Sequence, residues 1–237
     1  MSTTDLIKNA LKSHADGEKA QVLHRFFQAF VGGYGEGDRF LGATVPFQRA
    51  VAKKYYKDAV LTDLQALLES DTHEHRLTTI FMLVLKFESA KDEAERKKIV
   101  DFYLKHLDCV NNWDLVDSSA PKILGPWLFD KDRSILYDLA RTNHLWRQRV
   151  AIMATFSFIK QDDFEDAIRI SELLLDHPHD LIHKATGWML REIGNRDSET
   201  EERFLKKHYK RMPRTMLRYA IEKFPPLKRK RYLSSEI

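Results

Sequence analysis

Apolar residues recur at helical spacing through nearly the whole chain. Residues 75–87 (HRLTTIFMLVLKF) and 181–194 (LIHKATGWMLREIG) place their apolar side chains three and four positions apart, which is the period of an α-helix. Glycine and proline, which mark the tight turns of sheet proteins, number only 9 and 7 in 237 residues. No segment has a convincing strand pattern. The sequence therefore predicts an all-α protein whose helices are joined by short loops.

The helices also repeat along the chain. When the apolar-rich helices are aligned on one position, a polar or aromatic residue recurs about every 35 residues, at Arg76, Trp113, Arg149, Lys184 and Arg218. Residues 150–159 (VAIMATFSFI) carry no charge and suit an inner layer, whereas residues 163–175 (DFEDAIRISELLL) are amphipathic and suit an outer helix. We predict a HEAT-like α-solenoid of stacked antiparallel helix pairs with a basic concave face, formed by a single domain over residues 1–237.

Charge and cysteine content narrow the class of protein. The formal net charge is +4 and the isoelectric point is about 9.0, which permits an anionic partner. The single cysteine, Cys109, excludes an intramolecular disulfide, favours a reducing compartment and is expected to be a buried thiol. The N-terminal residues lack an apolar signal segment, and no window has 18 consecutive apolar residues. We expect a cytoplasmic monomer with no membrane partner.

Basic and aromatic residues gather at the recurring positions. Trp113 and Asp117 are spaced i to i+4, so their side chains are neighbours on one helix. Trp188 lies between two cations on another helix face, and Arg149 interrupts an otherwise apolar helix. Basic side chains interleaved with aromatic ones suit a nucleic-acid partner. We expect DNA-binding side chains at Arg76, Lys184, Arg191, Arg214 and Arg218.

Each of these positions also has a structural interpretation. Trp188 fits a core position, and Arg149 fits an ion pair with a buried carboxylate such as Asp117. Asp117 also fits the cap of a helix that begins near Ser118 and Pro121. Taken singly, these interpretations are as good as a functional one. The recurrence of five such positions in register favours a shared functional surface.

Other patterns do not predict a site. His73 and His75, like His177 and His179, are spaced i to i+2, which does not put both on one helix face, so no metal site is expected. The glycine-rich residues 31–46 (VGGYGEGDRFLGATVP) are expected to form a loop. Their GYGEGD stretch follows no strand, so we do not expect a phosphate-binding motif there. No serine or cysteine has the local sequence of an activated nucleophile.

Several motifs, taken in order, resemble one protein family. They are NNWDLVDSSAPKILG, LWRQRVAI, LIHKATGWMLRE and MPRTMLRYAIEKFP, preceded by FLGATVP. From about residue 20 to 230 the chain resembles the AlkD-like family of bacterial DNA alkylation-repair glycosylases. The resemblance implies a HEAT-like solenoid that binds duplex DNA carrying alkylated bases. It also implies hydrolysis of the N-glycosidic bond of cationic alkylpurines, such as 3-methyladenine and 7-methylguanine, without a metal or cofactor.

The resemblance assigns roles to four residues. The family's catalytic aspartate falls on Asp117, its two cleft tryptophans fall on Trp113 and Trp188, and its functional arginine falls on Arg149. We therefore expect a monofunctional alkylpurine-DNA glycosylase of the bacterial cytoplasm, associated with the nucleoid when it is bound to DNA. A non-catalytic scaffold for damaged or branched DNA, and a protein-binding solenoid, are the alternatives.

The chain departs from the family pattern at two places. A tyrosine of the family's cleft aligns with Phe26, which has no hydroxyl group. Ala43, Thr44 and Val45 stand where the family can carry a longer polar side chain. Both departures are expected to affect lesion preference or DNA engagement.

Overall fold

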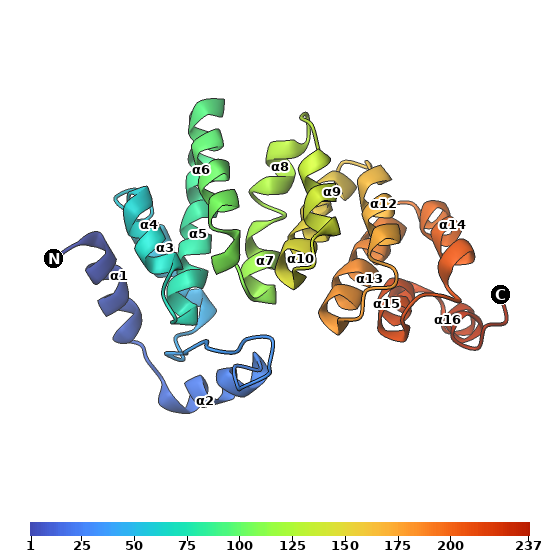
Figure 1. Ribbon diagram of the computed structural model, residues 1–237, viewed down its shortest axis with the longest axis horizontal. Helices are drawn as coiled ribbons and strands as arrows, with labels where there is room; N and C mark the ends of the chain where they lie inside the picture. The colour runs from blue at the N-terminus through green and yellow to red at the C-terminus, as the bar shows by residue number, and fades with distance from the viewer. The chain divides into compact units, whose positions relative to one another are not determined.

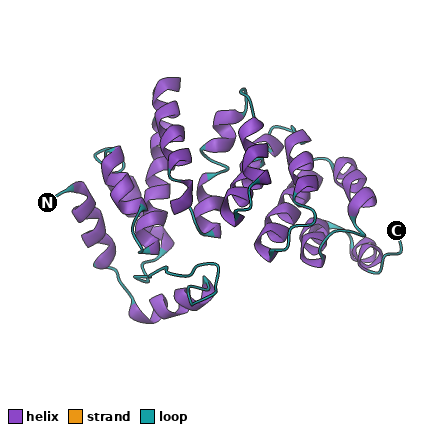
Figure 2. Ribbon diagram, viewed as in Figure 1, coloured by secondary structure: helices purple, strands orange, loops and turns teal.

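The computed structural model describes residues 1–237, and every regular element in it is a helix (Figures 1 and 2). The one extended pairing is an isolated bridge between Arg39 and Thr72. This confirms the predicted all-α class. No helix combines the length and the apolar character that crossing a membrane would need. The chain divides into two compact units, Met1–Ser119 and Ala120–Ile237.

The N-terminal unit is organised around one long helix, α5. Helices α3, α4, α6 and α7 all pack against α5, and α1 packs against α3 and α4. The helices of this unit are α1 (Thr3–Lys12), α2 (Gly17–Phe26), α3 (Val45–Tyr55), α4 (Leu61–Leu68), α5 (His73–Ser89), α6 (Glu93–Lys105), the 3₁₀ helix η1 (Leu107–Cys109) and α7 (Trp113–Ser119) (Figure 1).

The C-terminal unit is organised around α13 in the same way. Helices α10, α12, α14 and α15 pack against α13, and α9 packs against α10. The helices of this unit are α8 (Leu124–Leu128), α9 (Ser134–Arg141), α10 (Leu145–Ala154), α11 (Phe156–Ile159), α12 (Glu165–Leu173), α13 (Asp180–Gly194), α14 (Ser198–His208), α15 (Arg214–Ala220), the 3₁₀ helix η2 (Ile221–Lys223) and α16 (Pro226–Leu233).

The predicted repeat corresponds to a series of inner helices. The five recurring positions fall on α5, α7, α10, α13 and α15, and consecutive inner helices within a unit pack on one another. Within the charge-free segment, the residues from Val150 to Ala154 are at most 1% exposed, which confirms its inner-layer position. The solenoid-like arrangement of helix pairs is thus present in each unit. The single domain over residues 1–237 stays a prediction.

Two further segments with helical periodicity, residues 145–160 and 19–30, form shorter helices than that periodicity predicts. The segment 145–160 is divided at Thr155, whose hydroxyl donates a hydrogen bond to the carbonyl of Ile152 at 2.6 Å. Such a bond offers the backbone an alternative to the helix ladder. The segment 19–30 leaves the helix after Phe26, and Gln28 has a positive φ of 49°. A left-handed residue cannot continue a right-handed helix.

The contact between α13 and α15 depends on a glycine. A Cβ atom at Gly187 would lie 2.4 Å from the carbonyl oxygen of Met216 and 2.6 Å from the Cβ of Tyr219. Both atoms belong to the backbone or its first side-chain carbon, so a rotamer change cannot move them away. The two helices can approach this closely only because residue 187 has no side chain.

We expect Gly187→Ala to destabilise the C-terminal unit. Separating the helices should cost about 1–3 kcal/mol, partly offset by the ~0.5–1 kcal/mol that alanine gains over glycine in a helix. Urea unfolding checks this, with Gly17→Ala as the control, because a Cβ at Gly17 meets nothing within 4 Å. An unfolding free energy for Gly187→Ala higher than that of wild type, as alanine gives at an unconstrained helix position, would contradict the close contact.

Candidate functional site

Helix α7 carries the predicted tryptophan and aspartate on one face. The helix extends over Trp113–Ser119, so Trp113 and Asp117 are one turn apart, and both side chains are half-buried. The next helix begins only at Leu124 and has no side-chain cap. Asp117 therefore lies inside α7, and the interpretation of Asp117 as the cap of the following helix is wrong.

The C-terminal end of α7 is fixed to α6. Ser119 donates to the carbonyl of Leu115 at 2.6 Å, and its hydroxyl lies 2.9 Å from that of Tyr103, a fully buried residue of α6. Burial raises the pKa of Tyr103, and the charge of Asp117 adds to this effect. The side of α7 that faces away from Trp113 and Asp117 is thus held by hydrogen bonds in the core.

Aromatic rings form a stack beneath Trp113. Its indole stacks on Phe27 with the ring centroids 5.4 Å apart, and Phe27 in turn stacks on Phe40 at 5.4 Å and meets His73 at 4.7 Å. Phe26 meets Trp113 edge to face at 6.0 Å and is 60% exposed. An exposed apolar ring therefore lies beside Trp113, at the position where the family resemblance implies a tyrosine.

A buried charged network supports this stack. It is made of Asp38, His73, Arg76, Asn112 and Asp114, and we call it the His73 network. His73 lies between two carboxylates, with Nδ1 2.9 Å from Asp38 and Nε2 2.8 Å from Asp114. Arg76 donates to the other oxygen of Asp38 at 2.5 Å, and Asn112 donates to Asp38 at 3.3 Å. The network joins the glycine-rich loop, α5 and the start of α7.

The charges of the network stabilise one another. Burial alone would raise the pKa of Asp38, but the hydrogen bond from His73 and the charge of Arg76 hold that pKa below its usual value. Burial alone would lower the pKa of His73, but the two carboxylates raise it from 6.5 to about 9. His73 is therefore an imidazolium at neutral pH, and the two cations balance the two carboxylates.

The network corrects one expectation. Arg76 is 4% exposed, and it also donates to the carbonyl of Ser70 at 2.9 Å. Its guanidinium is buried and hydrogen-bonded within the N-terminal unit. Arg76 therefore does not offer the exposed positive charge that DNA binding would need.

The first turn of α5 also anchors the glycine-rich loop. The carboxylate of Glu74, 1% exposed, accepts hydrogen bonds from the backbone N–H groups of Leu41 at 3.0 Å and Gly42 at 2.8 Å. Gly42 has a φ of 85°, a conformation that favours glycine. Two residues later, Thr44 accepts from the N–H of Phe47 and caps α3. The predicted loop is therefore a fixed element of the unit.

In the C-terminal unit, α13 positions Trp188. Its side chain is half-buried, its indole N–H donates to Glu192 at 2.9 Å, and its ring lies 6.0 Å from that of Phe156. Arg149, on α10, is 4% exposed and donates to the carbonyl of Leu181 at 2.5 Å, in the first turn of α13. Arg149 thus bridges two neighbouring inner helices.

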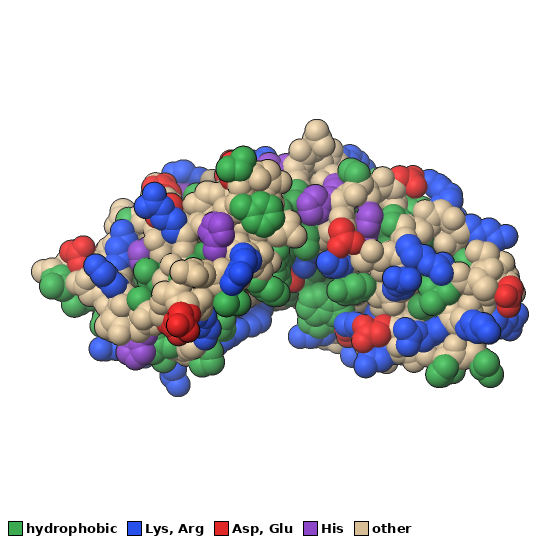
Figure 3. All heavy atoms as spheres, turned by 90° about the horizontal axis from the view of Figure 1, so that it is seen from below, with side chains coloured by type: hydrophobic (Ala, Val, Ile, Leu, Met, Phe, Trp, Pro, Cys, Tyr) green, Lys and Arg blue, Asp and Glu red, His purple; other side chains and the backbone are tan.

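The predicted cations of this unit differ in their environment. Arg214 and Arg218, on α15, are exposed. Lys184 pairs with Asp180 at 2.6 Å, whereas Arg191 is only 17% exposed and pairs with Glu192 and Glu222. On the face drawn in Figure 3, Lys and Arg side chains lie over much of the C-terminal unit, among apolar and acidic ones.

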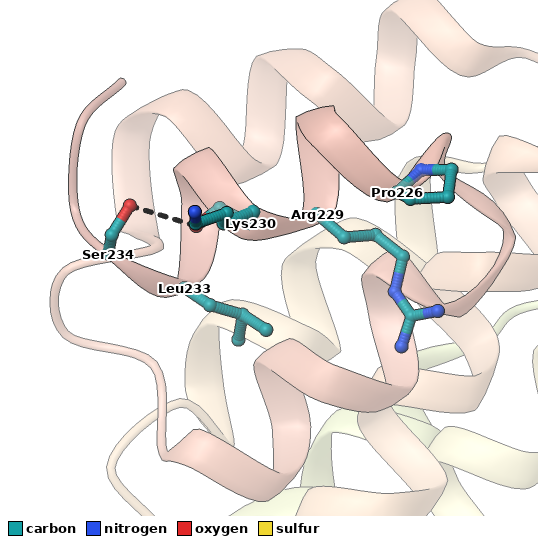
Figure 4. A pocket seen from close by; sticks show the side chains of 5 residues that line it. All are labelled: Pro226, Arg229, Lys230, Leu233 and Ser234. Carbon is teal, nitrogen blue, oxygen red and sulfur yellow. Dashed lines mark hydrogen bonds between the residues drawn. The ribbon is translucent and has the colours of Figure 1, made fainter.

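Helix α16 adds two further cations. A shallow pocket of about 410 Å³ lies on this helix. Figure 4 shows the side chains that line it, among them Arg229 and Lys230 with the apolar Pro226 and Leu233. Lys228, on the same helix, is paired with Glu202. Some cations of the C-terminal quarter are therefore neutralised by ion pairs, whereas others remain exposed.

Sequence reasoning missed the His73 network. His73 and His75 were considered only as a metal pair, but each has another partner, and His75 bonds to Ser70 at 2.9 Å. A usable signal was present, because His73, Glu74 and Arg76 open a helix that continues as an apolar run. Polar groups at a buried helix start need partners. The sequence does not single out Asp38 as that partner, because four other carboxylates lie between it and His73, those of Asp58, Asp63, Glu69 and Asp71.

We expect the stability contribution of His73 to depend on pH. A histidine whose pKa rises on folding stabilises the native state fully below its unfolded pKa of 6.5, and this contribution is lost as the pH passes about 9. The rise in the pKa of His73 from 6.5 to about 9 corresponds to roughly 3 kcal/mol of folding stability. Urea unfolding of wild type and His73→Gln over this range checks it. A free-energy difference between them that stays constant with pH would contradict the assignment.

Comparisons with known proteins agree with this fold. A family model described as DNA alkylation repair enzyme matches residues 7–224. Among solved structures, the predicted DNA alkylation repair enzyme from Enterococcus faecalis is similar, with a TM-score of 0.70 and 16% sequence identity over 90% of this chain and 98% of that one. At this identity the likeness concerns the fold alone. The search of curated proteins found no match. Because the family model spans nearly the whole chain, this protein belongs to the DNA alkylation repair enzyme family.

Proposed function

We propose that this protein is a DNA glycosylase that hydrolyses the N-glycosidic bond of cationic alkylpurines in duplex DNA, with 3-methyladenine and 7-methylguanine as substrates. Membership of the family supports a role in the repair of alkylated DNA. The observation that carries the finer proposal is the pair on α7, where Asp117 and Trp113 share one face beside the exposed ring of Phe26. A carboxylate and aromatic rings together suit a substrate that becomes positively charged.

Asp117 stabilises the charge that develops on the sugar. An N3- or N7-alkylated purine is already cationic, so it leaves without being protonated, and the deoxyribose becomes an oxocarbenium ion. A carboxylate at ~4 Å, with an effective dielectric constant of about 20, contributes ~4 kcal/mol before desolvation is subtracted. That amounts to roughly a thousandfold in rate. The same carboxylate orients the water that attacks the sugar, and the reaction ends without strand cleavage.

The aromatic residues hold the cation. A positive charge over the face of a tryptophan gains ~0.5–2 kcal/mol, and Trp113 offers such a face at the start of α7. Trp188 and Arg149 carry the roles that the family resemblance implies, those of the second cleft tryptophan and of the functional arginine. Arg214 and Arg218 bind phosphates of the DNA backbone, since both are exposed cations on an inner helix.

A non-catalytic DNA-binding scaffold is the second candidate. Phe26 favours it, because this residue lacks the hydroxyl group of the aligned family tyrosine and leaves an exposed apolar ring at the site. Such a scaffold would bind damaged or branched DNA in a salt-dependent way without releasing a base.

The Asp117→Asn variant tests the chemistry. We expect release of methylated purine from duplex DNA to fall about a hundred- to thousandfold under single-turnover conditions, because the neutral amide cannot stabilise the oxocarbenium ion. Chromatography of the free bases would follow 3-methyladenine and 7-methylguanine separately. Asp101→Asn is the control, since Asp101 is an exposed carboxylate of α6 that pairs with Lys97. Equal rates for Asp117→Asn and wild type would rule out the mechanism, and no release by wild type would favour the scaffold.

The double variant Arg214→Gln, Arg218→Gln tests DNA binding. Each phosphate contact that is lost should reduce the slope of log K against log salt by about 0.9. Fluorescence anisotropy with a duplex at several salt concentrations measures that slope. Arg169→Gln, on the outer helix α12, removes an exposed arginine that pairs with Glu165 and should leave the slope unchanged. The proposed contacts would be excluded by identical slopes for the double variant and wild type.

A further inference from the structure

We propose that His73 is a positioning residue for the reaction, and that its imidazolium, held between Asp38 and Asp114, fixes the first turn of α7 and thereby the orientation of Trp113 and Asp117. The reaction itself is the one given under Proposed function, and the inference rests on it. His73 is assigned no contact with DNA, since its side chain is only 3% exposed.

The hydrogen bonds of His73 require both ring nitrogens to donate. Each nitrogen faces a carboxylate oxygen, at 2.9 Å for Asp38 and 2.8 Å for Asp114. An ionised carboxylate only accepts hydrogen bonds, and a neutral imidazole has only one N–H group. Loss of the proton would therefore break one of the two bonds. Asp38 would keep its donors Arg76 and Asn112, whereas Asp114 would keep only the N–H of Leu115, so the bond that ties α7 to His73 is the one with the least support.

The network reaches Trp113 from both of its chain neighbours. Asp114 follows Trp113 and accepts from His73, while Asn112 precedes it, is fully buried and donates to Asp38. The side chain of Asn112 also accepts from the N–H of Trp113 at 2.8 Å. Asp117 lies three residues after Asp114 on the same helix. The backbone that carries the tryptophan and the aspartate is thus bound to the network at its start.

A second path passes through the aromatic stack. The ring of His73 lies 4.7 Å from Phe27 and 5.0 Å from Phe40, and Phe27 stacks on Trp113. A change in the position of His73 would shift the surface on which the indole rests. The two paths start from the same side chain. A buried histidine can therefore control the half-buried face of α7 that carries Trp113 and Asp117.

The charges around His73 make its protonation state decisive. From the loop it faces Asp38, from α7 it faces Asp114, and from its own helix Arg76 lies on the far side of Asp38. Two cations and two carboxylates balance only while His73 is protonated. Burial opposes the proton, but the carboxylates outweigh burial and raise the pKa of His73 to about 9. Trp113 is expected to change its environment as the pH passes this value.

Two measurements on the full-length protein test the proposal. The first is fluorine NMR of protein labelled with 5-fluorotryptophan, in which Trp113→Phe assigns the resonance of Trp113. In wild type this resonance should titrate with a midpoint near the His73 pKa of about 9, and in His73→Gln the titration should disappear. The second is single-turnover base release at neutral pH, which should fall about 10- to 100-fold in His73→Gln, because small misplacements of catalytic groups have effects of that size.

The matched control is His75→Gln. His75 lies on the same helix, two residues further on, and is buried as well, but its hydrogen bond goes to Ser70 rather than to α7. Burial lowers the pKa of His75 to about 4, so His75 cannot cause a titration near 9. The Trp113 titration and the rate of base release should both be retained in this variant. Should His73→Gln not fold, Asp114→Asn replaces it, and the midpoint of the Trp113 titration should then move below 9, because the carboxylate of Asp114 helps to raise the pKa of His73.

The outcomes separate this proposal from the proposed function. A Trp113 resonance that does not titrate, or that titrates equally in His73→Gln, overturns the role of His73. Base release by His73→Gln at the wild-type rate overturns it as well. If wild type releases no base while the Trp113 titration still depends on His73, the glycosylase reaction is excluded, and the control of α7 by His73 is supported.

Discussion

The arrangement of the N-terminal unit depends on two carboxylates that come from distant parts of the chain, one buried and the other half-buried. Asp38 lies in the glycine-rich loop and Asp114 opens α7, and an unpaired charge at the buried Asp38 would be strongly destabilising. His73 and Arg76, one turn apart at the start of α5, supply the compensating charges. Because the four charges compensate one another only when they are together, the loop, α5 and α7 must come together as well. The aromatic stack of Phe27, Phe40 and Trp113 then closes over His73.

This dependence is a consequence of the shortness of α7. A helix of seven residues is marginal by itself, since too few backbone hydrogen bonds follow its nucleation. Apolar packing of Leu115 and Val116 buries one side of it, but packing alone is tolerant of small rotations. Hydrogen bonds to Asp114 at one end and to Ser119 at the other define its rotation much more closely. In the C-terminal unit the orientation of the central helix is fixed in another way. Helix α13 is longer than α7, packs closely on α15 at Gly187 and is joined to α10 by Arg149.

Much of this fold could be predicted from local patterns, whereas the support of the site could not. Periodicity identified the helices, and the recurrence from Arg76 to Arg218 identified the inner layer, because both depend on residues close in sequence. The hydrophobic periodicity did not predict where the helices end at Phe26 and Thr155, because these ends depend on the backbone conformation of single residues. The His73 network joins residues 38, 73 and 114, which no local spacing connects. For the same reason Arg76 was expected on the surface, since a cation in an apolar helix gives no sign of the partner that buries it.

Phe26, at the position where the family resemblance implies a tyrosine, would affect how the proposed site discriminates between substrates. A phenol can donate a hydrogen bond and so read the polar pattern of a base or sugar, whereas a phenyl ring offers only its apolar surface and its quadrupole. Beside Trp113 it contributes a second aromatic edge, and Asp117 contributes a negative charge. Selection would then rest on the positive charge of the lesion and on the lability of its glycosidic bond. A neutral lesion lacks both, so the proposed site would suit bases that alkylation has made cationic. In the proposed reaction Asp117 would need only to stabilise the charge as it moves from the base to the sugar.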